Sequence, residues 1–178
     1  MMSDINYRDN LFKRYNITTI HGEPTSKTLR KLQNEIKANA KSVYSNLVGR
    51  SHGHLGLVFT DSQYTLILPT PSVYPTHPGP LVIPYGTTYH ANSNIWTAHT
   101  YRVRLFQEVM GVDQALMQQI VATVKEAYLA DIRNRTTNYI NNTVTDVLTH
   151  LQDNYSQVVT HELLKHKDIV KKTIYNPR

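Results

Sequence analysis

The chain contains no cysteine among its 178 residues. This absence excludes disulfides, cysteine-based zinc sites, iron–sulfur clusters and a thiol nucleophile. Long apolar runs are also missing, because none approaches the ~18 residues needed to span a bilayer. The polar first residues do not resemble a secretion signal. We therefore expect a cytoplasmic protein that has no membrane partner.

Charge is scarce in the middle of the sequence. Residues 51–100 contain no Lys or Arg, a single acid (Asp61), five His and most of the prolines. The whole chain carries 19 Lys and Arg against 13 Asp and Glu, for a net charge of +6. A basic protein is attracted to polyanions such as RNA. With 40% hydrophobic and 18% charged residues, the chain is expected to be globular.

The domain organisation follows from proline and from apolar periodicity. We predict a polar N-terminal arm over residues 1–24 and a single helical domain over residues 25–178. Between residues 69 and 90 the repeated prolines exclude a helix, because proline lacks the backbone donor and forces the preceding residue to be extended. This segment should be a long loop, and its apolar residues favour packing against the body.

The periodic segments predict a mainly α fold of five or six helices. Thr25 or Ser26 should cap the first helix, and Gly49 should end it. Its apolar residues step by three or four: Leu29, Leu32, Ile36, Ala40, Val43 and Leu47. A capping box from Thr60 to Gln63 predicts a short helix that buries Tyr64 and Ile67. Residues 51–59 between these helices fit either a strand or an extended core segment.

The second half of the chain should contain the remaining helices. One has Trp96, His99, Val103, Phe106 and Met110 on a single stripe and should break at Gly111. The next should start near Asp113 and bury Leu116, Ile120, Val124 and Ala127. A third should bury Val144, Val147, Leu148, Leu151 and Tyr155. The last should be capped by Thr160 and bury Leu163, Leu164, Val170 and Ile174.

The first helix also carries the best candidate nucleic-acid site. Its solvent side should present a basic stripe, which consists of Lys27, Arg30, Lys31, Lys37 and Lys41. Spaced cations on one helix neutralise several phosphates and release counterions. The competing interpretation is a solvated helix face. Arg133, Arg135 and the lysines at 165, 167, 171 and 172 are weaker candidates of the same kind.

The histidines of the middle segment raise a metal hypothesis. His52 and His54 form a His-x-His pair, and His77 or His90 could add a third ligand. No nearby carboxylate is available to orient them except Asp61. These histidines could equally bond backbone groups at glycine turns. We predict no metal, no cofactor and no small-molecule substrate, and the absence of a Gly-x-Ser-x-Gly elbow or a phosphate loop indicates a non-enzymatic protein.

Six segments together resemble one known family. They are residues 32–47, 52–58, 77–84, 128–134, 143–151 with Tyr155, and 175–177. In this order they are similar to the Gag-like N-terminal region of copia-type retrotransposon polyproteins. The resemblance implies a capsid-like helical domain that self-assembles around RNA. It also implies a chain truncated at its C-terminus, because the family continues into a second helical half.

Three functions are therefore expected from the sequence. The first is a Gag-like structural protein that assembles with itself and binds RNA non-specifically. The second is a basic RNA-binding module that does not assemble. The third is a histidine–metal hydrolase.

Overall fold

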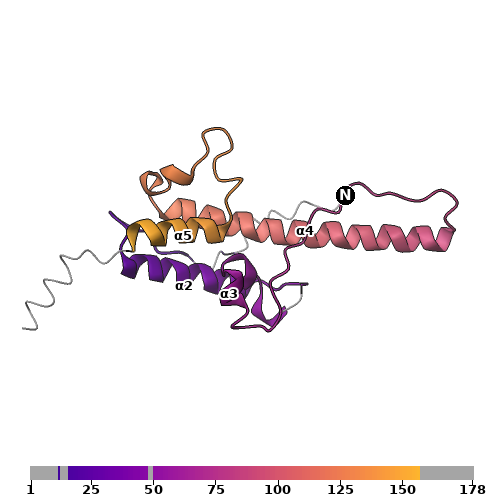
Figure 1. Cartoon of the computed structure of the whole chain (residues 1–178), viewed down its shortest axis with the longest axis horizontal. Helices are drawn as coiled ribbons and strands as arrows, with labels where there is room; N and C mark the ends of the chain where they lie inside the picture. The colour runs from indigo at the N-terminus through magenta and orange to yellow at the C-terminus, as the bar shows by residue number, and fades with distance from the viewer. Residues whose placement is uncertain (1–11, 13–15, 48–49, 157–178) are drawn as a thin grey trace, which may run out of the picture.

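The computed structural model describes residue 12, residues 16–47 and residues 50–156. Within these ranges the chain forms no β-strand and four α-helices, which are α2 (Ser26–Ser42), α3 (Asp61–Tyr64), α4 (Tyr89–Thr123) and α5 (Val144–Tyr155). The predicted mainly α class is confirmed. Figure 1 shows α2, α5 and one half of α4 side by side as a body, and the other half of α4 projects from it.

Helix α2 begins where the sequence predicts. The Thr25 hydroxyl accepts a hydrogen bond from the Thr28 N–H, and the Thr28 hydroxyl in turn receives the Thr25 N–H. This capping box satisfies backbone donors at the helix start. The predicted core residues of the helix are buried: Leu29, Leu32, Ile36 and Ala40.

The predicted end of this helix at Gly49 is wrong. The helix ends at Ser42, and Val43 is already extended. The reason is a returning turn: the His54 N–H donates to the Ala40 carbonyl at 2.8 Å. This contact satisfies one of the carbonyls that a helix leaves unpaired at its C-terminus. A contact from outside the helix therefore fixes its end.

Residues 50–68 fold as short helical turns next to the C-terminal end of α2 (Figure 1). Two 3₁₀ helices, Arg50–His52 and Leu55–Leu57, occupy the segment that the sequence predicts to be either a strand or an extended core segment. The capping box of Thr60 and Gln63 is confirmed, and α3 buries Tyr64. Ile67 was expected to be buried but is 38% exposed, because α3 ends at Tyr64.

Helix α4 runs without a break through Gly111, so the predicted break and the predicted cap at Asp113 are wrong. Glycine inside a helix costs only about 1 kcal/mol. Burial of Val109 and Val112 on either side of Gly111 offsets this cost. Trp96, predicted to face the core, is 58% exposed, and Ala127 lies exposed beyond the end of α4.

The core lies between α2, α5 and the C-terminal half of α4. A capping box of Thr143 and Asp146 starts α5. Its predicted core residues Val144, Val147, Leu148 and Leu151 are buried. Part of the predicted N-terminal arm docks on this body, because the Ile20 N–H donates to the Thr123 carbonyl at 2.9 Å. The helix predicted after Thr160 lies outside the described residues.

Residues 69–88 contain no helix or strand and lie along α4 in the opposite direction. The Tyr74 side chain forms a hydrogen bond with Asp113. Farther along, the His77 ring meets the edge of Phe106 at a centroid distance of 5.1 Å. The loop therefore follows α4 from its middle toward its N-terminus.

Candidate nucleic-acid interface

The five cations predicted on the first helix share one side of α2. At 3.6 residues per turn, Lys27, Arg30, Lys31, Lys37 and Lys41 span about 120° of the helix circumference. The buried residues of α2 lie on the opposite side. Packing of that side against α4 and α5 leaves the cationic side, called here the basic face, toward solvent.

Lys37 differs from the other four cations. Its Nζ lies 4.6 Å from the centroid of the Phe59 ring, a cation–π contact. Burial against this ring lowers the pKa of Lys37. Lys37 therefore connects α2 to the segment before α3, and it is less available to a phosphate than the sequence suggested.

The remaining cations of the basic face are exposed: Lys27, Arg30, Lys31 and Lys41. Lys31 Nζ lies 3.9 Å from Glu35 Oε1. Glu35 is also held by Thr18, whose N–H and hydroxyl donate to its carboxylate at 2.8 and 2.7 Å. An exposed pair at this distance is worth little. A phosphate therefore competes easily for Lys31.

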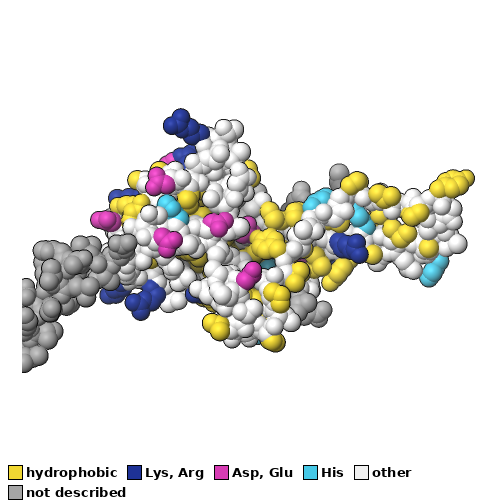
Figure 2. Space-filling view, viewed as in Figure 1, with side chains coloured by type: hydrophobic (Ala, Val, Ile, Leu, Met, Phe, Trp, Pro, Cys, Tyr) yellow, Lys and Arg dark blue, Asp and Glu magenta, His cyan; other side chains and the backbone are white. Residues whose placement is uncertain are grey.

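Lys27, Arg30 and Lys31 line a shallow depression at the N-terminal half of α2, together with Asn34, Glu35 and Ala38. The positive end of the helix dipole lies at the same end, and the first turn contains no acid. Figure 2 shows dark-blue Lys and Arg side chains over the body, including the region of α2. Cationic charge is therefore concentrated at this end of the helix.

The weaker cationic candidates differ in whether they are exposed, paired or outside the described residues. Arg133 pairs with Glu126, and its Nε donates to Asn138 Oδ1 at 3.1 Å, so it closes the turn after α4. Arg135 is exposed in the same turn. The candidate lysines at 165, 167, 171 and 172 lie outside the described residues.

The histidines of the metal hypothesis lie in different environments. The His54 ring is buried, the His77 Nδ1 accepts the Gly79 N–H at 3.0 Å, and His90 is exposed at the start of α4. The His52 Nδ1 lies 2.8 Å from the Ser51 hydroxyl. Among the described residues, no three His, Asp or Glu side chains are grouped as metal ligands.

Sequence reasoning missed the polar cluster around His54. The His54 Nε2 lies 3.2 Å from the Tyr44 carbonyl and 3.6 Å from Glu108 Oε1. Asn46 donates to the same carboxylate through its side chain at 2.7 Å. Burial lowers the pKa of His54, although the Tyr44 carbonyl and Glu108 oppose this shift. The neutral ring therefore joins the end of α2 to α4.

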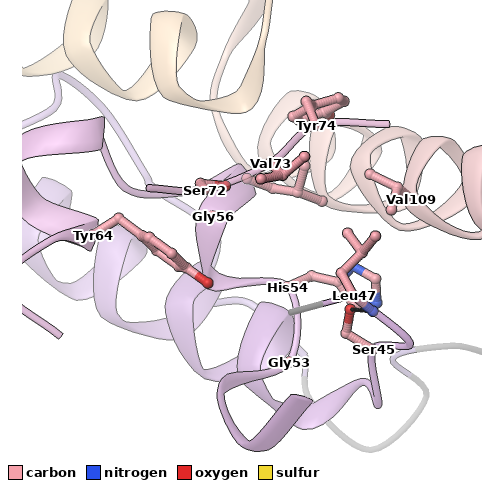
Figure 3. Close-up of a pocket in the computed structure, with 11 residues that line it drawn as sticks. Ser45, Leu47, Gly53, His54, Gly56, Tyr64, Ser72, Val73, Tyr74 and Val109 are labelled. Carbon is pink, nitrogen blue, oxygen red and sulfur yellow. Dashed lines mark hydrogen bonds between the residues drawn. The ribbon is translucent and has the colours of Figure 1, made fainter. Parts of the chain in front are cut away.

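A small cavity lies beside His54 (Figure 3). Its volume is about 30 Å³, which leaves room for about one or two water molecules. Ser45 and His54 line one side, Tyr64 of α3 lines another, and Ser72 of the loop closes it. A cavity of this size accommodates solvent and is too small for a substrate.

The projecting half of α4 is the other surface that the sequence did not reveal. All the buried residues of α4 lie at or after Val109. Residues 89–108 therefore extend outward from the core, which they join at Glu108 beside His54 and Asn46, and residues 76–88 lie next to them; together they are called here the α4 projection. In Figure 2 this part shows mostly yellow and white groups with some cyan His and dark-blue Lys or Arg, while magenta carboxylates lie over the body.

No helix in the described part of the chain is both long and apolar enough to cross a membrane. Comparison of the chain with known protein families, with curated proteins and with solved structures finds no match.

Proposed function

We propose that this chain is a non-enzymatic, Gag-like structural protein that assembles with itself and binds RNA without sequence preference. The observation that carries the proposal is the exposed basic face of α2, which lies opposite the buried side of the same helix. The order of the six segments similar to copia-type Gag proteins supports the same function.

The geometry of the basic face suits a phosphate backbone. From Lys27 to Lys41 the helix advances about 21 Å, which spans several phosphates of a nucleic-acid strand. The face is held rigidly, because Leu32 and Ile36 on the opposite side are fully buried. Contacts of lysine and arginine to phosphates position a nucleic acid but do not read its bases.

Salt dependence tests the RNA-binding part of the proposal. Five phosphate contacts to single-stranded RNA would give a log–log slope of about −3.5, at about −0.7 per contact. Because Lys37 is held at Phe59, we expect four contacts and a slope of about −2.8. Changing Lys27, Arg30, Lys31 and Lys41 together to Gln should bring the slope close to zero, and Gln maintains the helix nearly as well as Lys.

A matched variant controls for net charge. Arg102, Arg104, Lys125 and Arg135 are also exposed, and changing them to Gln lowers the net charge from +6 to +2, exactly as much as the first variant does. Because Arg102 and Arg104 lie on the α4 projection, the slopes are compared at concentrations where the chain is monomeric, and this control should then retain a slope near −2.8. Equal flattening in both variants would show that total charge, and not the basic face, binds RNA. A strong preference for one RNA sequence would also contradict the proposal.

A further inference from the structure

The α4 projection is long and lacks support from the core. Its helical part, residues 89–108, is about 30 Å long at 1.5 Å per residue. The loop is attached to it by contacts such as the one between His99 Nε2 and the Gly79 carbonyl, at 2.9 Å. None of its side chains is buried. A rigid element of this length therefore presents most of its surface to solvent (Figure 1).

Large apolar side chains cover much of this surface. Ile83, Tyr89 and Trp96 line a shallow depression with Asn92 and Ser93. Tyr89 is 90% exposed and Trp96 is 58% exposed. Val82, Tyr85 and Tyr101 are further exposed apolar groups of the projection. Aromatic residues presented by a rigid element are characteristic of the energetic centres of protein interfaces.

The charge of the projection indicates what would cover it. No Lys, Arg, Asp or Glu occurs from residue 62 to residue 101, and the charged residues of the projection, Arg102, Arg104 and Glu108, lie at its end next to the body. An acidic or basic partner, RNA included, would find no countercharge among residues 62–101. Two copies of the uncharged part of this surface, residues 76–101, would not repel one another, and their aromatic side chains would pack together. The surface therefore suits a second copy of this chain.

The size of the surface is adequate for such a pair. Half of a helical cylinder about 30 Å long and about 11 Å wide has an area on the order of 500 Å². The adjacent loop adds further area to this face. A standard interface buries about 800 Å² on each partner. The projection is therefore close to the size that a specific dimer requires.

We propose that the α4 projection pairs with the same projection of a second copy, around a two-fold axis, and that Trp96 is buried in this contact. A two-fold contact uses the same patch on both partners, which a self-complementary apolar surface satisfies. The inference rests on the proposed assembly function and identifies the surface that carries it out.

The chain contains a single tryptophan, so Trp96 reports on this contact without labelling. Fluorescence of the full chain should shift to shorter wavelength as concentration rises, in parallel with the mass measured by light scattering. An emission that is already blue-shifted and independent of concentration would show that another part of the same chain covers Trp96, and it would overturn the proposal.

Two charge variants locate the contact on the molecule. Ser93→Glu places a carboxylate one turn from Trp96, on the same side of α4. Two copies would then bring like charges together, so the dissociation constant for self-association should rise at least about tenfold. Gln118→Glu adds the same charge to an exposed position of the same helix on the body. It should change the constant by less than about twofold.

The outcomes separate this inference from the proposed function. The wild type could self-associate without a shift of Trp96 emission, and Ser93→Glu could self-associate equally well. These results would overturn the role of the projection but leave assembly in place. A wild type that stays monomeric at every concentration would overturn both. Circular dichroism of Ser93→Glu should match that of the wild type, because an exposed Glu favours a helix.

Discussion

Asp113 has a different role in the structure from the one that the sequence predicted. The sequence places it at a helix start, but in the structure it lies within α4 and bonds the Tyr74 side chain of the loop. Burial raises the pKa of its carboxyl to about 6, although the hydrogen bond from Tyr74 opposes this shift. Its Oδ1 is buried without a hydrogen-bond partner among the described residues. A long-range pair of this kind leaves no periodic signal in the sequence.

The raised pKa of Asp113 predicts a pH effect. The carboxyl holds its proton more tightly in the folded chain than in the unfolded chain, whose aspartate pKa is about 3.9. The contribution of Asp113 to the free energy of unfolding should therefore rise as pH falls from 7 through about 6 toward 4. Asp113→Asn lacks this contribution, so the stability of the wild type relative to the variant should increase over this range.

Urea denaturation of both proteins at pH 7, 6 and 5 measures this difference. Comparison with the variant is necessary because His54 acts in the opposite direction. Its lowered pKa means that stability is lost as pH falls below about 6.5, where the unfolded histidine takes up its proton. This loss is common to both proteins and cancels. A difference that is constant or decreases on acidification would contradict the environment described for Asp113.

At the scale of elements, local signals predicted the starts of helices better than their ends. Thr25 and Thr60 cap α2 and α3 as the sequence predicted, through contacts within three residues. Thr143 caps α5 in the same way, although no cap was predicted there. The end of α2 depends on His54, which returns from a later turn. The continuity of α4 through Gly111 depends on burial in the core. Both of these outcomes require tertiary contacts.

Gly53 makes the end of α2 testable. Its φ is +56°, and a Cβ there would lie 2.6–2.7 Å from the carbonyl oxygens of Ala40, Lys41 and Val43. Gly53→Ala should therefore combine backbone strain of about 1–2 kcal/mol with overpacking of about 1–3 kcal/mol. Urea denaturation followed by circular dichroism measures the loss in the free energy of unfolding.

Gly22→Ala is the matched control for this prediction. Gly22 also has a positive φ, of +84°, but no atom lies within 4 Å of its Cβ position. It should lose only the strain of about 1–2 kcal/mol. If the two variants lost equal stability, the close approach of Gly53 to α2 would be refuted.

At the scale of the whole molecule, two surfaces of different character lie on different parts of the fold. The basic face belongs to α2 on the body, and the α4 projection, which has no charged residue over residues 76–101, extends away from the body (Figures 1 and 2). The sequence predicted the first surface, because its cations recur on one helix. The sequence did not predict the second surface, because apolar residues such as Trp96 follow helical spacing both in a core and on an exposed helix.

Under the proposed function, this separation would allow one chain to bind RNA and a second copy at the same time. RNA held on the basic face would bring copies together and raise their local concentration, which promotes contacts between their projections. Assembly and RNA binding should therefore reinforce one another. An RNA-binding module that does not assemble would lack this coupling.

Light scattering of the full chain, with and without single-stranded RNA, tests the central claim most directly. The account predicts a mass that rises above the 20.4 kDa of one chain as concentration increases, and that rises further when RNA is added. The rise with RNA should disappear in the four-Gln variant of the basic face. A mass that remains that of one chain, or of one chain with one RNA, at all concentrations would contradict a structural, self-assembling protein.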